Sequence, residues 1–189
     1  ALSHTAFGPL FGHQYSQTWI DFRGLRDGYS RWRGIDYFEN SRRATYAQRR
    51  YAIANPAGFT GYGNDIWGLT ACDGPGDFAI DIGGRTRRFL SYSARGVPDN
   101  DDGTIAPTAA LGSIAFAPDI VVPAARAMQA RYGRAIYRDY GFVDSFNPTL
   151  TAPDAPIRTG KVVPGIGWVD SDYLGIDQGP IVCMIENWR

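Results

Sequence analysis

The stretch GIDYFENSRRATYAQRRYAIANP (residues 34–56) carries the clearest helix signal in the chain and decides the fold class that we predict. Asp36 can cap this helix, with Glu39 three residues later as its capping-box partner. Four residues fall on roughly one helical stripe: Tyr37, Ala44, Ala47 and Tyr51. The helix ends at Asn55, because the residue before a proline avoids the helical region.

The same helix signals in the rest of the sequence predict a mostly helical chain. We expect further helices over 16–27, 107–115 and 118–132, and a last helix of about fifteen residues after Ser171 and Asp172. Residues 77–82 (DFAIDI) alternate and predict one short strand. Five or six helices and almost no sheet predict an all-α fold with long structured loops and at most a short β-hairpin.

The composition excludes several classes of protein. With 189 residues, of which 44% are hydrophobic and 14% aromatic, the chain can bury the core of one domain. Its net charge of zero argues against a nucleic acid or an acidic membrane as partner. No apolar run reaches the ~18 residues of a membrane span. A basic and apolar leader is also missing, so we expect that any export signal has been removed or lies elsewhere.

The polar residues favour ordered loops over a metal or thiol site. Seventeen of the 19 acidic residues are Asp, and they stand beside 23 Gly and 12 Pro. Cys72 and Cys183 lack metal-site spacing; we favour two buried thiols, with a disulfide as the alternative. His4 and His13 are too few to support a zinc site or a Ser-His-Asp hydrolase. We therefore expect no metal and no cofactor.

The glycine-rich segment GYGNDIWGLTACDGP (residues 61–75) suits carbohydrate handling. Aromatic faces stack on sugar rings, and polar side chains bind the hydroxyl groups; here these residues are Tyr62, Asp65, Trp67 and Asp73. The alternative is structural: Trp67 fills the core, and Asp73 forms a turn onto Gly74.

Two later segments each offer a carboxylate for acid or base chemistry. In GFVDSFNP (141–148), Asp144 lies between Phe142 and Phe146, and apolar surroundings would raise its pKa. The alternative is a turn or a helix cap. In YLGIDQGP (173–180), Asp177 either caps the last helix or faces a site.

Two charged clusters are most simply structural. Glu39 with Arg42 and Arg43 predicts an ion-paired helix face. The acidic triplet of Asp99, Asp101 and Asp102 lacks the ligand spacing of a known calcium loop, so we expect a solvated loop, with calcium binding as the alternative.

Six segments in order resemble the glucoamylase-like domain of bacterial proteins, which occurs in endo-β-1,2-glucanases of glycoside hydrolase family 144 and in cyclic β-1,2-glucan synthases. The segments are FGHQYSQTWIDFRG (11–24), residues 34–56, residues 61–75, DDGTIAPTAALGSIAFAP (101–118), YGFVDSFNP (140–148) and YLGIDQGPIVCMIENWR (173–189). The resemblance implies an (α/α)6 toroid and an inverting glycosidase without a cofactor. Its two catalytic carboxyl groups would stand about 6.5–9.5 Å apart.

The resemblance also implies roles for single residues. Five or six helices cannot close a twelve-helix toroid, so residues 1–189 would be the C-terminal half, completed by an N-terminal half that supplies the general acid. Asp144 is then the preferred base, with Asp177 second. The expected cleft residues are Glu39, Arg42, Tyr62, Trp67 and Asp73. The family usually has Gly-Glu-Asn where this chain has Gly63, Asn64 and Asp65, which puts the role of Asp65 in doubt.

The predicted activity is hydrolysis of a bacterial β-glucan, most simply β-1,2-linked, in the periplasm or outside the cell. Two alternatives stay open. One is a non-catalytic carbohydrate-binding domain, and the other is a β-1,2-glucan transglycosylase.

Overall fold

The computed structural model describes residues 5–189, so His4 lies outside the described part. The predicted central helix is present as α3 (Tyr37–Ala54) and begins as expected, since the Asp36 side chain accepts a hydrogen bond from the Glu39 N–H at 2.8 Å. The buried face differs from the predicted stripe. It is largely polar and consists of Asn40, Ser41, Ala44, Thr45, Gln48 and Ala52. Polar side chains are buried here because they bind neighbouring backbone; Gln48, for example, exchanges hydrogen bonds with Leu69.

The helices in this part of the chain are short except for three. The α-helices are α1 (Phe11–Gln14), α2 (Gly28–Arg33), α3, α4 (Pro107–Leu111), α5 (Pro118–Tyr132) and α6 (Gly175–Trp188), with 3-10 turns at Tyr15–Thr18 and Gly133–Ala135. The predicted helices at 107, 118 and the chain end are confirmed. The helix expected over 16–27 is wrong, because Asp27 caps a separate helix, α2.

Nine strands form four small antiparallel sheets in residues 5–189. The strands are β1 (Ala71–Cys72), β2 (Phe78–Ile82), β3 (Arg85–Phe89), β4 (Ser93–Ala94), β5 (Tyr137–Arg138), β6 (Gly141–Phe142), β7 (Phe146–Asn147), β8 (Lys161–Val163) and β9 (Gly167–Val169). β1 pairs with β4, β2 with β3, and β5 with β6, while the fourth sheet has the order β7-β9-β8. In that sheet Phe146 lies opposite Val169.

The expected all-α half-toroid is therefore wrong. Helix accounts for 37% of the structure and strand for 15%, which makes the fold mixed α/β. The predicted strand at 77–82 is present as β2, but the others were missed. The reason is length: a two-residue strand cannot show alternation, so pairing in the glycine-rich loops leaves no periodic signal.

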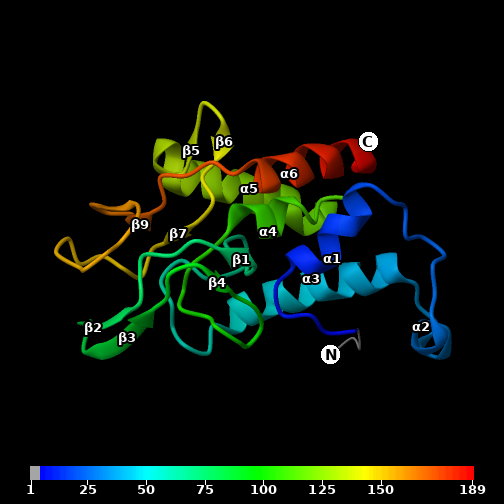
Figure 1. The fold of residues 1–189 in the computed structure, drawn as a ribbon, viewed down its shortest axis with the longest axis horizontal. Coiled ribbons are helices and arrows are strands. Elements are labelled where there is room, and N and C mark those ends of the chain that lie inside the picture. The colour runs from blue at the N-terminus through cyan, green and yellow to red at the C-terminus, as the bar shows by residue number, and fades with distance from the viewer. Residues whose placement is uncertain (1–4) are drawn as a thin grey trace.

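The helices form one body, and the sheets gather at one of its ends. Helices α4, α5 and α6 lie together along one side, α1 packs against α3, and the β2–β3 hairpin lies at the left end of the view with β7 and β9, far from α2 on the right (Figure 1). The main core lies between these helices and includes Trp67 and Met128, both 0% exposed. A smaller core of Phe89, Leu150 and Trp168 supports the sheet end.

Two simple expectations can be compared with this fold. Cys72 is buried, Cys183 is half-buried, and the two are unpaired thiols, as favoured from the sequence. Among residues 5–189, no helix combines the length and the apolarity that crossing a bilayer requires.

Candidate active site

Four aspartates converge where the sheet end meets α6. Asp73 follows β1, Asp144 lies between β6 and β7, Asp170 follows β9, and Asp177 lies in the first turn of α6. Asp144 and Asp170 are each 1% exposed, and Asp177 is 4% exposed. The structure thus brings together three predicted site residues, Asp73, Asp144 and Asp177, that lie far apart in the chain.

Hydrogen bonds hold Asp144 in place. One of its carboxylate oxygens, Oδ2, accepts the backbone N–H of Asp73 at 2.7 Å, and its own N–H binds the carbonyl oxygen of Asp172 at 3.0 Å. Its carboxyl group also interacts electrostatically with that of Asp177. Three buried carboxyl oxygens have no hydrogen-bond partner among the described residues: Asp144 Oδ1, Asp170 Oδ2 and Asp177 Oδ2. These buried oxygens therefore lack a hydrogen-bond donor from the protein.

Burial raises the pKa of all three of these carboxyl groups. For Asp144, burial and the neighbouring charge of Asp177 outweigh the Asp73 N–H, which acts in the opposite direction. For Asp177, burial outweighs the hydrogen bond to Asp144. Burial raises the pKa of Asp170 to about 7, although the Ser171 N–H opposes the shift. The pKa values of the coupled pair Asp144 and Asp177 therefore both lie above the usual carboxyl range.

The acidic cluster has room for a cation, but acidic residues alone do not define a metal site. One oxygen from each of Asp73, Asp144 and Asp170 lies within 4.8 Å of the other two. The salt bridges of residues 5–189 include none of the buried carboxylates at 144, 170 and 177. Since an acidic cluster by itself does not define a metal site, we assign no metal here.

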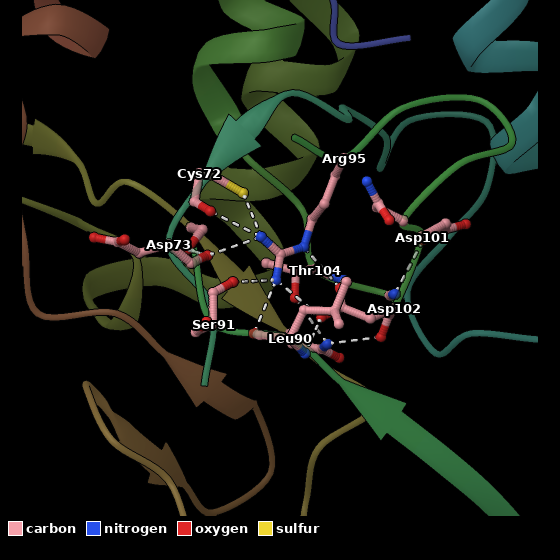
Figure 2. Close-up of polar contacts among 12 residues, drawn as sticks. Cys72, Asp73, Leu90, Ser91, Arg95, Asp101, Asp102 and Thr104 are labelled. Carbon is pink, nitrogen blue, oxygen red and sulfur yellow. Dashed lines mark hydrogen bonds and ion pairs between the residues drawn. The ribbon is translucent and has the colours of Figure 1, made fainter. Parts of the chain in front are cut away.

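The segment that carries Asp73 is anchored by a buried arginine. Arg95 follows β4 and is 0% exposed. Figure 2 shows its guanidinium group between the Cys72–Asp73 segment, the Leu90–Ser91 segment and the Asp102 carboxylate. Asp102 is itself 2% exposed, so the expected solvated acidic loop is wrong at this residue, because its charge is neutralised by a buried ion pair.

Asp101 is also not part of a solvated loop. Its carboxylate accepts hydrogen bonds from the hydroxyl groups of Tyr51 at 2.9 Å and Tyr62 at 2.7 Å. The predicted cleft residue Tyr62 therefore contributes to this network, and it also lines a separate cavity with Asp65 and Arg131. Tyr62 and Asp65 share that cavity with each other but have no hydrogen bond to Asp144.

The structure places three other predicted cleft residues away from the aspartate cluster. Trp67 is 0% exposed in the main core, so it has no free ring face for a sugar, and the core-filling alternative is correct. Glu39 pairs with Arg43 at 2.8 Å and with Arg42 at 3.6 Å on α3, which is the ion-paired helix face. The hydrogen bonds and ion pairs of residues 5–189 do not link Glu39 or Arg42 to the aspartate cluster.

Asp177 does not cap α6. The cap position is Leu174, and no side chain satisfies the first amides of the helix. Its carboxyl group interacts electrostatically with that of Asp144 instead. A location in the first helical turn still suits a negative charge, because the N-terminal end of a helix is electropositive.

Sequence reasoning missed Asp170, Arg95 and an aromatic pair. Tyr140, on the β5–β6 turn, is 77% exposed and lies edge-to-face with Tyr173 at 5.8 Å between ring centres. Both rings line a 690 Å³ surface cavity with Asp172 and Gln178. Since the carbonyl oxygen of Asp172 binds the N–H of Asp144, this cavity adjoins the aspartate cluster. The signal that could have been used was the tyrosine close in sequence to each of Asp144 and Asp177.

Comparison with known proteins identifies the class. The Glycoamylase family model, described as "Putative glucoamylase", matches residues 1–189. The chain therefore belongs to this family, and the resemblance seen in the sequence is confirmed.

Three similar proteins have names that refer to β-1,2-linked glucans or glucooligosaccharides. An exo-β-1,2-glucooligosaccharide sophorohydrolase (non-reducing end) of Parabacteroides distasonis is 35% identical over 183 residues, 96% of this chain and 20% of the relative. A crystal structure of a β-1,2-glucanase from P. distasonis is 35% identical, with a TM-score of 0.72, over 96% of this chain and 21% of that one. For the endo-β-1,2-glucanase of Chitinophaga pinensis, solved with sophorotriose and glucose, the identity is 34% and the TM-score 0.72, over 98% and 37%. The chain thus spans about a fifth of the curated relative.

Proposed function

We propose that this chain contributes the base side of a glycoside hydrolase that inverts and cleaves a bacterial β-glucan, with β-1,2-linked glucan as substrate. The observation that carries the proposal is the clustering of buried Asp144 with Asp73, Asp170 and Asp177, in which burial and the neighbouring carboxyl groups raise the pKa of Asp144. A carboxyl group with a raised pKa is a stronger base toward water once it is ionised. The names of the relatives in the family support the glucan substrate.

An inverting enzyme separates its acid from its base by about 6.5–9.5 Å to admit a water molecule. Asp144 and Asp177 are electrostatically coupled neighbours, so we assign them to one side of the reaction and not as the separated acid and base. In our proposal, Asp144 takes the proton from the attacking water, Asp177 tunes it, and Asp73 positions it through its N–H.

We further propose that the general acid comes from a complementary segment, the N-terminal part of the same domain, on the same polypeptide or another one. The small share of the relatives that this chain spans supports this division. Because β-1,2-glucans occur in the periplasm or outside the cell, we propose that the protein acts there.

The test is product analysis on defined glucans. The protein, alone and together with its complementary segment, is incubated with β-1,2-, β-1,3- and β-1,4-glucan, and the products are identified by mass and by the anomeric proton signal. Short β-1,2-oligosaccharides released with inverted configuration would support the proposal. Binding without cleavage would favour the carbohydrate-binding domain, and longer products would favour transglycosylation. The proposal is wrong in either of those cases, and also if no glucan binds.

The aromatic pair should contribute to substrate affinity. Replacing Tyr173 by alanine removes a ring that lines the cavity beside the aspartate cluster. We expect KM to rise about tenfold, equivalent to ~1.4 kcal/mol, while kcat changes little. Tyr173→Phe should retain the affinity, since the ring face is kept. Tyr29→Ala on the distant helix α2 is the control, and an unchanged KM for Tyr173→Ala would exclude the stacking role.

Chelation should leave the activity intact. The reaction we propose needs carboxyl groups and water, so treatment with EDTA and removal of the chelator should not change the hydrolysis rate. The rate is measured before and after treatment, and again with added Ca²⁺ or Mg²⁺. A loss of activity that these ions restore would instead assign a cation to Asp73, Asp144 and Asp170.

A further inference from the structure

The Arg95 side chain is saturated with hydrogen bonds in the interior. Its Nε donates to Asp102 Oδ1 at 2.8 Å, and its Nη2 donates to Asp102 Oδ2 at 2.9 Å and to the carbonyl oxygens of Leu90 and Ser91, both at 3.1 Å. Its Nη1 donates to the carbonyl oxygen of Cys72 at 2.8 Å and, at 3.5 Å, to that of Asp73. One planar group thus joins three segments of the chain, as Figure 2 shows.

Asp102 fixes the other side of the guanidinium group. Its carboxylate also accepts the N–H groups of Leu90 at 2.9 Å and Thr104 at 3.0 Å. Its carbonyl oxygen accepts a hydrogen bond from Asn147 Nδ2 at 3.0 Å. Asn147 lies in β7, three residues after Asp144, so the ion pair is connected to the base from two directions.

We propose that Arg95 is a positioning residue for Asp144, holding the Cys72–Asp73 segment so that the Asp73 N–H binds and orients the Asp144 carboxylate. The role of Asp144 as the base rests on the proposed function, whereas the contacts of Arg95 do not depend on it. A second contact holds the same segment: Ser145 Oγ donates to the carbonyl oxygen of Asp73 at 2.8 Å. The Asp73 amide is therefore clamped through the carbonyl groups on both of its sides.

Only an arginine fits this position. A lysine has one compact ammonium group with three donors and cannot reach Asp102 and both backbone segments from one plane. The adjoining Gly74 shows how closely the segment packs, since a Cβ atom there would collide with Arg95 Nη2 and the carbonyl oxygen of Leu90. Both observations indicate that the clamp tolerates little movement.

The Asp73 N–H has a distinctive electrostatic effect on Asp144. Other charged groups that face Asp144 are the carboxylates of Asp73, Asp170 and Asp177, all of which disfavour its ionised form. The Asp73 N–H favours the ionised form. If the clamp loosens and this hydrogen bond is lost, the pKa of Asp144 must rise further, and the base will ionise only at higher pH.

The experiment compares Arg95→Lys with wild type in the complete glucanase, by pH–rate profile and by the ¹³C titration of the Asp144 carboxyl carbon. We expect kcat to fall about 10- to 100-fold with KM little changed. We also expect the rising limb of the profile and the Asp144 titration to move to higher pH. Asp102→Asn, which loosens the same clamp, should move both in the same direction and provides the test if Arg95→Lys does not fold.

The exposed Arg88, in the neighbouring strand β3, supplies the matched control, Arg88→Lys, which should leave both readouts unchanged. A purely structural role for Arg95 would lower the folded fraction without moving the titration of Asp144, and that result would overturn the proposal. If wild type hydrolyses no glucan, the proposed function fails, while the titration still decides whether Arg95 controls Asp144.

Discussion

Replacing Asp144 by asparagine should abolish glucan hydrolysis, with kcat falling by about 10³-fold or more. Asparagine keeps the size of the side chain and can still accept the Asp73 N–H, but it cannot take a proton from water. The substrate should still bind with nearly the same affinity, because the cavity beside Tyr140 and Tyr173 is unchanged. Steady-state kinetics and calorimetric binding of a β-1,2-oligosaccharide measure the two quantities separately.

The matched control for Asp144→Asn is Asp139→Asn. Asp139 precedes the strand β6, but its side chain is exposed and pairs with Arg134 at 3.3 Å on the surface. Its replacement should leave kcat and KM as they are, since surface ion pairs contribute little. If Asp144→Asn retained the wild-type kcat, the base would lie elsewhere, and the chain would be better described as a binding domain.

A third variant separates the two members of the pair. Asp177→Asn removes the neighbouring charge that raises the pKa of Asp144. The pKa of Asp144 should therefore fall, and the rising limb of the pH–rate profile should move to lower pH, opposite to the shift expected for Arg95→Lys. A limb that does not move would show that Asp144 and Asp177 are not coupled during turnover.

Helices were predictable where their signals are local. The start of α3 follows from Asp36 and Glu39, three residues apart, and α5 ends at Gly133, where the backbone turns with φ of +50°. Strands such as β5 and β7 have two residues each and carry no such signal. The family resemblance could not correct this, because the (α/α)6 toroid that it implied specifies helices and does not specify which loop residues pair as strands.

The sequence predicted three of the four clustered aspartates, but not Asp170 and not the contacts among them. Asp144 stood out because two phenylalanines flank it, whereas its partner Asp73 lies 71 positions earlier in the chain. Asp170 had no such context and is recognised only by its burial. For Trp67, composition could not distinguish a sugar platform from a core residue; that depends on tertiary packing.

The stability of the folded chain should fall as the pH rises from about 5 to 8, and Asp170 is a major cause. Burial raises the pKa of Asp170 from 3.8 to about 7. Between these values the unfolded chain releases the proton while the folded chain retains it, so rising pH favours unfolding. For this one group, the loss in the free energy of unfolding is on the order of 3 kcal/mol. Asp144 and Asp177, whose pKa values are also raised, act in the same direction.

Asp170→Asn isolates this contribution, because asparagine does not titrate. Urea unfolding at several pH values between 5 and 8 should give a free energy that falls less steeply for Asp170→Asn than for wild type, even if the unpaired amide lowers stability at every pH by ~1–3 kcal/mol. Asp154→Asn, at an exposed loop position, should reproduce the wild-type slope. Parallel curves for Asp170→Asn and wild type would mean that Asp170 is ionised in the folded state. The four aspartates would then need a neutralising cation, and the trio of Asp73, Asp144 and Asp170 would be the place for it.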